Sequence, residues 1–439
     1  MTDYFLMGHE GKKVSFRLPA GWQVLRNAVI KVEKTEKPLE QLVREAIASP
    51  LGTPPLADLV KGKGSVAIIV DDLTRPTPRK ALLACLLDFL HDLGIGNDQV
   101  DVLIGVGTHR PLSRAEIEDT FGGKLCREVR FTNHDCRASD LVSVGTLKFG
   151  GELLLNPIAV KADVRIAIGS LLPHLHNGFG GGAKLVLPGI AGWDTIRRHH
   201  VALTIAHGVT LGNLKGNPFH DDITEAGRLG KLDFIINVVY DADEDVKAIV
   251  AGDFEKAFAF GARLCEKELG VRFDRAADVT IASAFPYTEG PQVMKPLCPA
   301  TMVTKKGGVV IIFAPHIRGG RFPESLLDVF SGAHSRANRD TRGLVFDFLS
   351  RGELLIPDAT MDFNSALNTV LLFLSRVKVL LVSKDADEQQ AAQLGFAYAG
   401  SLDDAIAAVS RSLPDATVNI LPLGGLVLPL VAEEMKFTY

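Results

Sequence analysis

The sequence predicts an α/β fold in two domains, each with a mainly parallel sheet flanked by helices. Short apolar runs alternate with longer amphipathic segments along the chain, which is the pattern of βα units. The length of 439 residues also exceeds what a single hydrophobic core usually holds. We therefore expect one domain over residues 1–274, a second over residues 275–439, and an active site in the cleft between them.

The strands of the first domain are predicted where apolar runs are continuous, because strands buried on both faces do not alternate. An amphipathic helix over residues 253–269 follows them, and residues 270–275 are expected to act as a hinge. The predicted strands cover residues 66–70, 102–106, 164–169 and 234–240.

The second domain repeats the alternation of strand and helix. A helix is expected over residues 402–409, and the apolar tail from about residue 418 is expected to pack back on the first domain. The predicted strands cover residues 279–284, 309–314 and 377–382.

The composition excludes several classes of protein. A net charge of −4 offers no basic surface for nucleic acid, so no nucleic-acid partner is expected. Five cysteines, odd in number and without a CxxC pair, indicate reduced thiols rather than a disulfide framework. No apolar run reaches transmembrane length and the N-terminus lacks a signal-peptide pattern, so we expect a cytoplasmic protein without a membrane partner.

Polar side chains that can carry chemistry follow three of the predicted strands. Asp72 and Arg75 follow the first strand, His109 follows the second, and His174 follows the third. Ligands of open parallel sheets bind outside the carboxyl ends of the strands. A lone histidine is more often structural, but three such strand ends together indicate a functional site.

A glycine-rich loop after His174 is the most informative local feature. Gly180, Gly181 and Gly182 let the backbone approach a ligand closely, and the loop ends at Lys184. Leu185 follows in place of Ser or Thr and no GxxxxGK spacing is present, so the loop is not a P-loop. Two further imidazoles, His199 and His200, lie in a polar segment that is expected to begin or end a helix.

Together these residues resemble the nickel-pincer-dependent lactate racemases and their 2-hydroxyacid racemase and epimerase relatives. The resemblance extends over nearly the whole chain, and its motifs are specific in combination rather than singly. They lie at residues 71–76, 107–110, 173–184, 187–190, 200, 216–218 and 292–295.

The resemblance implies a cofactor and a role for each motif. The cofactor is a nickel-pincer nucleotide, a pyridinium mononucleotide with two sulfur arms and bound nickel, made and loaded by dedicated maturation enzymes. A planar nickel site with sulfur donors and one imidazole suits Ni(II). The implied residues are Lys184 as covalent anchor, with Asp72, Gly181 and Gly182 beside the cofactor; His200, or its neighbour His199, on nickel; His109 and His174 as the acid/base pair; and Arg75, Gln292 and Lys295 on the substrate.

The implied reaction inverts a small-molecule 2-hydroxyacid. The Cα hydrogen is not acidic, so it leaves as hydride to the cofactor while one histidine takes the hydroxyl proton. The resulting planar 2-oxoacid receives the hydride on its other face. Histidine suits this role because its usual pKa is near the working pH.

Two departures from the family affect the expected substrate. Pro291 stands where lactate racemases have a tyrosine, and residues 361–365 lack the tryptophan of the corresponding family segment. Because sites that hydrogen-bond a substrate discriminate strongly, we expect a 2-hydroxyacid larger than lactate.

Three other interpretations of these residues compete with this one. An NAD-dependent dehydrogenase is disfavoured because no GxGxxG follows the first strand. A zinc hydrolase could use His174, His176, His199 and His200, although their spacing matches no common ligand pattern. A catalytically silent binding homologue stays open because the substrate pocket is altered.

Overall fold

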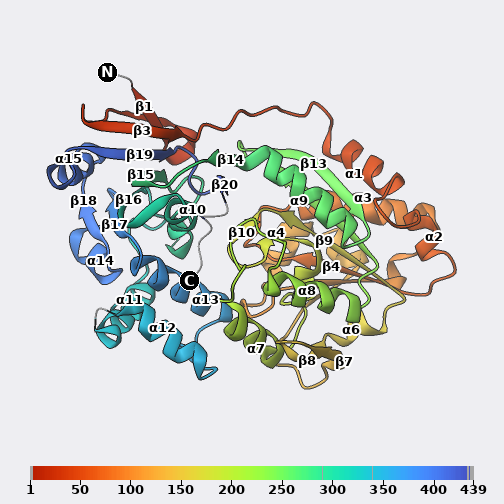
Figure 1. Ribbon diagram of the computed structural model, residues 1–439. Coiled ribbons are helices and arrows are strands. Elements are labelled where there is room, and N and C mark those ends of the chain that lie inside the picture. Colours follow the sequence, from red (N-terminus) through yellow and green to blue (C-terminus); the bar gives the residue numbers. More distant parts are fainter. Residues whose placement is uncertain (1–2, 289, 339, 433–434, 436–439) are drawn as a thin grey trace. The chain divides into compact units, whose positions relative to one another are not determined.

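The computed structural model describes residues 3–288, 290–338, 340–432 and 435 (Figure 1). The chain forms two compact units. The first unit contains Val32–Glu268 and Thr360–Asp362. The second unit contains Met1–Lys31, Leu269–Ala359 and Phe363–Tyr439.

A six-stranded sheet forms the centre of the first unit, with strand order β13-β12-β9-β4-β5-β6. All neighbouring strands are parallel except β13, which pairs antiparallel with β12. Because their runs are apolar throughout, the central strands β4, β9 and β12 are buried on both faces. The strand bounds are β4 Val66–Asp71, β5 Val100–Gly105, β6 Arg130–Asn133, β9 Val164–Leu171, β12 Phe234–Tyr240 and β13 Val246–Gly252.

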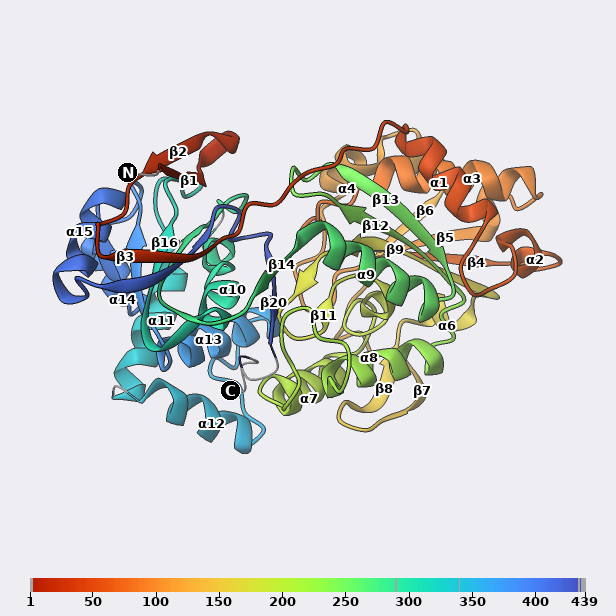
Figure 2. The ribbon, with the colours of Figure 1, turned by 45° about the horizontal axis from the view of Figure 1, so that its top comes forward.

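Helices cover both faces of this sheet (Figure 2). On one face, strand residues such as Ile68, Ile104 and Ile166 pack in one hydrophobic core with α1 and α3. On the other face, α9 approaches closely enough that a side chain at Gly261 would collide with Leu171. The helices of this unit are α1 Leu39–Ala48, α2 Leu56–Val60, α3 Arg79–Asp92, α4 Arg114–Phe121, α5 Leu125–Glu128, α6 Pro157–Lys161, α7 Trp193–Leu203, α8 Pro218–Leu229 and α9 Lys256–Leu269.

The order of strands changes direction at β4. The chain runs outward from β4 to β5 and β6, then returns to the other side of β4 as β9 and β12. The carboxyl ends of β9, β4 and β5 are therefore neighbours at a topological switch point. These are the three strand ends from which the sequence predicted a site.

The second unit contains its own six-stranded parallel sheet, with order β18-β17-β16-β15-β19-β3. Its core includes Val279, Ile281, Ile311 and Ile420. No helix among the described residues is long and apolar enough to cross a membrane. The elements are β3 Trp22–Asn27, β15 Ala277–Ser283, β16 Thr304–Phe313, β17 Lys378–Val382, β18 Ala397–Ala399, β19 Ala416–Leu421, α10 Leu297–Met302, α11 Glu324–Ala337, α12 Thr341–Ser350, α13 Met361–Leu374, α14 Glu388–Gln393 and α15 Leu402–Ser412.

Several parts of the chain differ from the predicted domain organisation, among them Thr360–Asp362 in the first unit. β3 pairs with β19, so the first 31 residues belong to the second unit. The tail at residues 416–421 is β19 itself, a strand inside the second sheet rather than a return to the first domain. The expected hinge contains strand β14, Gly270–Phe273, which pairs with β20, Leu428–Val431.

Candidate active site

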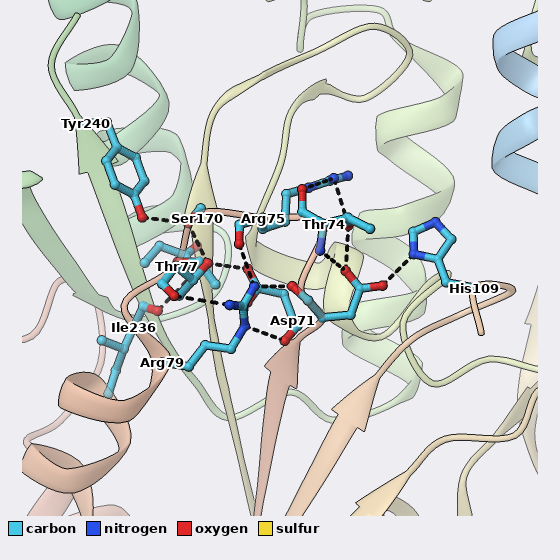
Figure 3. A network of polar contacts seen from close by, with 12 residues as sticks. Asp71, Thr74, Arg75, Thr77, Arg79, His109, Ser170, Ile236 and Tyr240 are labelled. Carbon is cyan, nitrogen blue, oxygen red and sulfur yellow. Dashed lines mark hydrogen bonds and ion pairs between the residues drawn. The ribbon is translucent and has the colours of Figure 1, made fainter. Parts of the chain in front are cut away.

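The first part of the site joins the ends of β4 and β5. Asp72 follows β4, and its Oδ2 atom accepts a short hydrogen bond from Nδ1 of His109 (Figure 3). Thr74 donates to the other carboxylate oxygen from its backbone N–H at 3.0 Å and from its hydroxyl. Burial raises the pKa of Asp72, but hydrogen bonding and charge from His109, with help from Thr74, outweigh burial and lower it to about 2. Asp72 is therefore ionised and orients the imidazole of His109.

A buried arginine shapes the loop that carries Asp72. Arg79 forms an ion pair with Asp71, Nε to Oδ1 2.8 Å, and donates to the carbonyl oxygens of Asp72 and Arg75 (Figure 3). The Thr77 hydroxyl lies 2.6 Å from that of Ser170 on β9, which ties the loop to the neighbouring strand. The loop is thus held by Arg79 and by the Thr77–Ser170 contact, and no short sequence motif reveals either one.

Arg75 lies in the same loop and is partly exposed. Its Nη1 atom donates to the carbonyl and hydroxyl oxygens of Thr74 at 3.2 and 3.1 Å. A guanidinium held by one nitrogen retains further N–H donors, which suits two-point binding of a carboxylate.

The second histidine lies in a tight hairpin. β10, Pro173–His174, pairs antiparallel with β11, Gly178–Phe179. Within it, Nδ1 of His174 accepts hydrogen bonds from the backbone N–H groups of His176 and Asn177 at 3.2 and 3.1 Å. Burial, reinforced by the charge of Lys184, lowers the pKa of His174 well below its usual value. His174 is therefore neutral near pH 7.

The glycine loop runs directly from this hairpin to Lys184. Gly181 and Gly182 have φ of +74° and +56°, a region that favours glycine. Asn237 on β12 accepts a hydrogen bond from the backbone N–H of Gly182 at 2.9 Å. A Cβ atom at Gly181 would lie 2.9 Å from Oδ1 of Asn237, so the loop is closely packed against β12.

Lys184 ends this loop within the short helix η3, Gly182–Leu185. Burial, with the charge of Arg75 as a second cause, lowers the pKa of Lys184 from 10.5 to about 7. A large fraction of this amine is therefore uncharged at neutral pH, as a nucleophilic or covalently linked lysine requires.

His199 and His200 lie in the last turns of α7, as the sequence predicted. His199 uses both nitrogens, with Nε2 3.2 Å from the Phe219 carbonyl oxygen and Nδ1 3.3 Å from Nδ1 of His200. His200 uses Nδ1 toward the carbonyl oxygen of Ile196 at 3.0 Å. Within the described part of the chain, no hydrogen bond uses Nε2 of His200, so this geometry favours His200 over His199 as a metal ligand.

Phe219 and Asn217 organise this part of the site from the start of α8. The Phe219 ring is fully buried and contacts the imidazoles of His176, His199 and His200, with centroids 5.5, 4.3 and 5.0 Å away. Asn217 caps α8 with Oδ1 and donates from Nδ2 to the carbonyl oxygen of His176 at 2.7 Å. Neither the role of Asn217 nor that of Phe219 is evident from the sequence, although Asn before Pro is a helix-start signal.

The remaining predicted residues lie in the second unit. Gln292 is in the short helix η4, Gly290–Met294, and Lys295 lies between η4 and α10, with Nζ 3.9 Å from the Tyr287 ring centroid. The two share a turn through the hydrogen bond from Lys295 N–H to the Gln292 carbonyl oxygen at 3.0 Å. The side chain of Pro291 is outside the described part of the chain. Their approach to a substrate, and the cleft between the domains, stay predictions.

The four histidines of the zinc interpretation do not form a metal-binding cluster. Within the described residues, no group of three or more His, Cys, Asp or Glu side chains is arranged to hold a metal ion. Three residues without an evident role in the sequence, Asn177, His220 and Asn237, hold the loops around His174 and Lys184.

Two histidines and a lysine with a lowered pKa, all at neighbouring strand ends, define an α/β enzyme site suited to proton transfer on a small ligand. Comparison with known proteins gives the family. Residues 8–212 match the lactate racemase N-terminal domain. A lactate racemase from Thermoanaerobacterium thermosaccharolyticum is 32% identical over 394 residues, which are 88% of this chain and 89% of that protein. One from Lactiplantibacillus plantarum is 32% identical over 280 residues, 63% of this chain and 66% of that protein.

Solved structures give the same result. The lactate racemase apoprotein from Thermoanaerobacterium thermosaccharolyticum has a TM-score of 0.83 and 28% identity, over 98% of this chain and 100% of that one. A Thermotoga maritima protein shares the fold with a TM-score of 0.63 and 22% identity, over 91% and 100% of the two chains. The chain belongs to the lactate racemase family and is an isomerase of the racemase type.

Proposed function

We propose that this protein is a racemase or epimerase of a 2-hydroxyacid larger than lactate and works with a nickel-pincer nucleotide attached to Lys184. The observation that carries the proposal is the grouping of Asp72–His109, His174 and Lys184 around the carboxyl ends of β5, β4 and β9. Proton-handling groups and a lysine with a lowered pKa are thereby brought to one edge of one sheet.

The residues of the first unit fit the proposed cofactor. Lys184 has a lowered pKa and suits a covalent link, and Nε2 of His200 suits a metal. When bound, the cofactor supplies the acceptor and donor for the Cα hydrogen and its electron pair.

The protein's own residues bind and orient the substrate and move its hydroxyl proton. Arg75 holds the carboxylate through its remaining N–H donors, and Gln292 and Lys295 are proposed to bind the substrate from the second unit. His109 and His174 act on the hydroxyl oxygen on the two faces of the substrate, and Asp72 stabilises the imidazolium of His109.

The larger substrate is supported by the start of α13. The backbone N–H of Met361 donates to Oγ1 of Thr108, next to His109, at 3.2 Å. The segment that lacks the family's tryptophan therefore begins beside the predicted base. We expect the smaller bulk of this segment to accommodate a substrate side chain larger than methyl.

The experiment is expression of the full chain together with the maturation enzymes that the cofactor requires. An intact-mass increase that disappears in Lys184→Ala, one nickel per chain, and turnover of a panel of 2-hydroxyacids are expected. Deuterium placed at Cα should stay in the inverted product. Activity from protein with unmodified Lys184, or full exchange of the deuterium with solvent, contradicts the mechanism. A loaded protein that turns over no 2-hydroxyacid supports the silent binding homologue instead.

A further inference from the structure

The two active-site histidines make different hydrogen bonds at the same ring atom. In His109, Nδ1 faces the carboxylate of Asp72, whose pKa of about 2 keeps it ionised. An ionised carboxylate only accepts hydrogen bonds, so Nδ1 of His109 carries the hydrogen. In the neutral ring, Nε2 of His109 is then the nitrogen with the lone pair.

His174 has the reverse arrangement. Its Nδ1 atom accepts from two backbone N–H groups, those of His176 and Asn177. A ring nitrogen that accepts cannot carry hydrogen, so the neutral ring of His174 carries it on Nε2. Turning the ring over would point a C–H group at both donors and lose both hydrogen bonds.

The side chains of Asn177, within the hairpin, and His220, in α8, hold the Asn177 donor in place. Asn177 is 1% exposed, and its Nδ2 donates to the Phe179 carbonyl oxygen at 2.7 Å, which leaves Oδ1 facing Nδ1 of His220 at 3.2 Å. The His220 ring stacks on Phe258 with centroids 5.4 Å apart and planes 18° apart. A continuous path therefore runs from His220 through Asn177 to Nδ1 of His174.

We infer that His109 and His174 rest in opposite tautomers, and that Asn177 and His220 are positioning residues that fix the tautomer of His174. In the resting enzyme, Nε2 of His109 accepts the substrate hydroxyl proton: the O–H bond breaks, an N–H bond forms, and Asp72 stabilises the resulting imidazolium. His174 in its resting tautomer presents Nε2–H as a neutral hydrogen-bond donor, and only its other tautomer, with Nε2 unprotonated, would act as the base for the opposite enantiomer. These catalytic roles rest on the proposed function, whereas the tautomers do not.

The groups around His174 do not favour its protonation. The charged or titratable groups that act on it are Arg75 after β4, His176 in its own hairpin, Lys184 in η3 and His200 in α7. All four lower the pKa of His174. The two backbone N–H donors and these neighbours therefore all disfavour a protonated His174.

The test is histidine ¹⁵N NMR on the full-length protein near pH 7, which reports the protonated nitrogen of each ring. The variants His174→Gln and His109→Gln assign the two signals by their loss. We expect Nε2–H for His174 and Nδ1–H for His109. The same tautomer in both rings, or Nδ1–H in His174, overturns the inference even without any variant.

The positioning role is tested by Asn177→Ala and His220→Ala, with His220→Gln as the conservative variant and exposed His207→Ala as the control. Loss of the path from His220 through Asn177 should give His174 mixed tautomers and a higher pKa. It should also lower kcat of the loaded enzyme about tenfold, which is the low end of the usual loss of activity when a supporting residue is mutated. The acidic limb of its pH profile should move to higher pH. His220→Gln should restore the wild-type signal and His207→Ala should not change it. Unchanged tautomer and pH profile in both alanine variants contradict the role, whereas correct tautomers in a loaded but inactive wild-type protein contradict only the proposed function.

Discussion

At the scale of single residues, Lys184 shows how burial prepares a side chain for chemistry. Its pKa of about 7 in the folded protein compares with 10.5 for an ordinary lysine. Between these values the unfolded chain binds more protons than the folded chain, so the folded state is penalised most at and below pH 7. Stability should therefore rise as pH increases from about 7 to 10.5.

Lys184→Met should remove this dependence and stabilise the unloaded protein near pH 7, while abolishing cofactor attachment and activity. Melting temperatures of the wild type and Lys184→Met at pH 7 and pH 9.5 check this. The difference between the two proteins should be smaller at pH 9.5 than at pH 7. The exposed Lys63→Met is the matched control and should change neither result. A Lys184→Met variant less stable than wild type at pH 7 would show that the buried amine is not penalised.

Asp72 acts at the same scale through His109. Asp72→Asn keeps the shape of the side chain but replaces the anion that orients and stabilises the imidazole. We expect kcat to fall by about 10²–10⁴, the usual range for losing general acid/base catalysis. Steady-state rates of the loaded enzyme, with circular dichroism to confirm folding, measure this effect. An Asp72→Asn variant with the full wild-type rate would show that Asp72 does not support proton transfer by His109.

At the scale of elements, the glycine loop depends on backbone geometry and on contact with β12. Gly181→Ala combines a left-handed φ with a Cβ atom 3.0 Å from the Ser170 carbonyl oxygen and 2.9 Å from Asn237. Gly216→Ala has a similar φ of +64° but open space around the new methyl group. We expect Gly216→Ala to cost about 1 kcal/mol and Gly181→Ala to cost about 1–3 kcal/mol more.

Urea unfolding of both glycine variants measures the difference, and intact mass after loading shows whether the loop still accepts the cofactor. Equal destabilisation by the two substitutions would mean that contact with β12 is unimportant.

The elements also show what sequence reasoning can predict. β4, β5, β9 and β12 were predictable because their apolar runs are continuous and their ends carry polar residues. The place of β3 was not, because its half-buried pattern fits an edge strand of either sheet and only its pairing with β19 decides. Asn177 and His220 were missed because their roles depend on contacts across 43 residues of sequence.

At the scale of the whole molecule, the proposed substrate choice can be tested where the chain passes from one unit to the other. Thr360–Asp362 belong to the first unit although the residues on both sides belong to the second. Phe363, which follows them, is a site where bulk can be restored. We expect Phe363→Trp to lower kcat/KM for larger 2-hydroxyacids relative to lactate by about tenfold, or 1.4 kcal/mol.

Matched kcat/KM measurements on lactate and on longer or aromatic 2-hydroxyacids check this prediction. Phe260→Trp, at an exposed position on α9, is the control and should leave the ratio unchanged. A wild-type enzyme that prefers lactate tenfold over every larger acid would contradict the proposed pocket.

Asn217 has a consequence for local motion. One side chain caps α8 at the backbone N–H groups of Phe219 and His220 and also holds the hairpin at His176. The first turn of α8 and the hairpin therefore cannot open independently, because opening either one breaks hydrogen bonds of the Asn217 side chain. In hydrogen–deuterium exchange, the amides of residues 176–177 and 219–220 should exchange as one cooperative unit, and Asn217→Ala should accelerate both together.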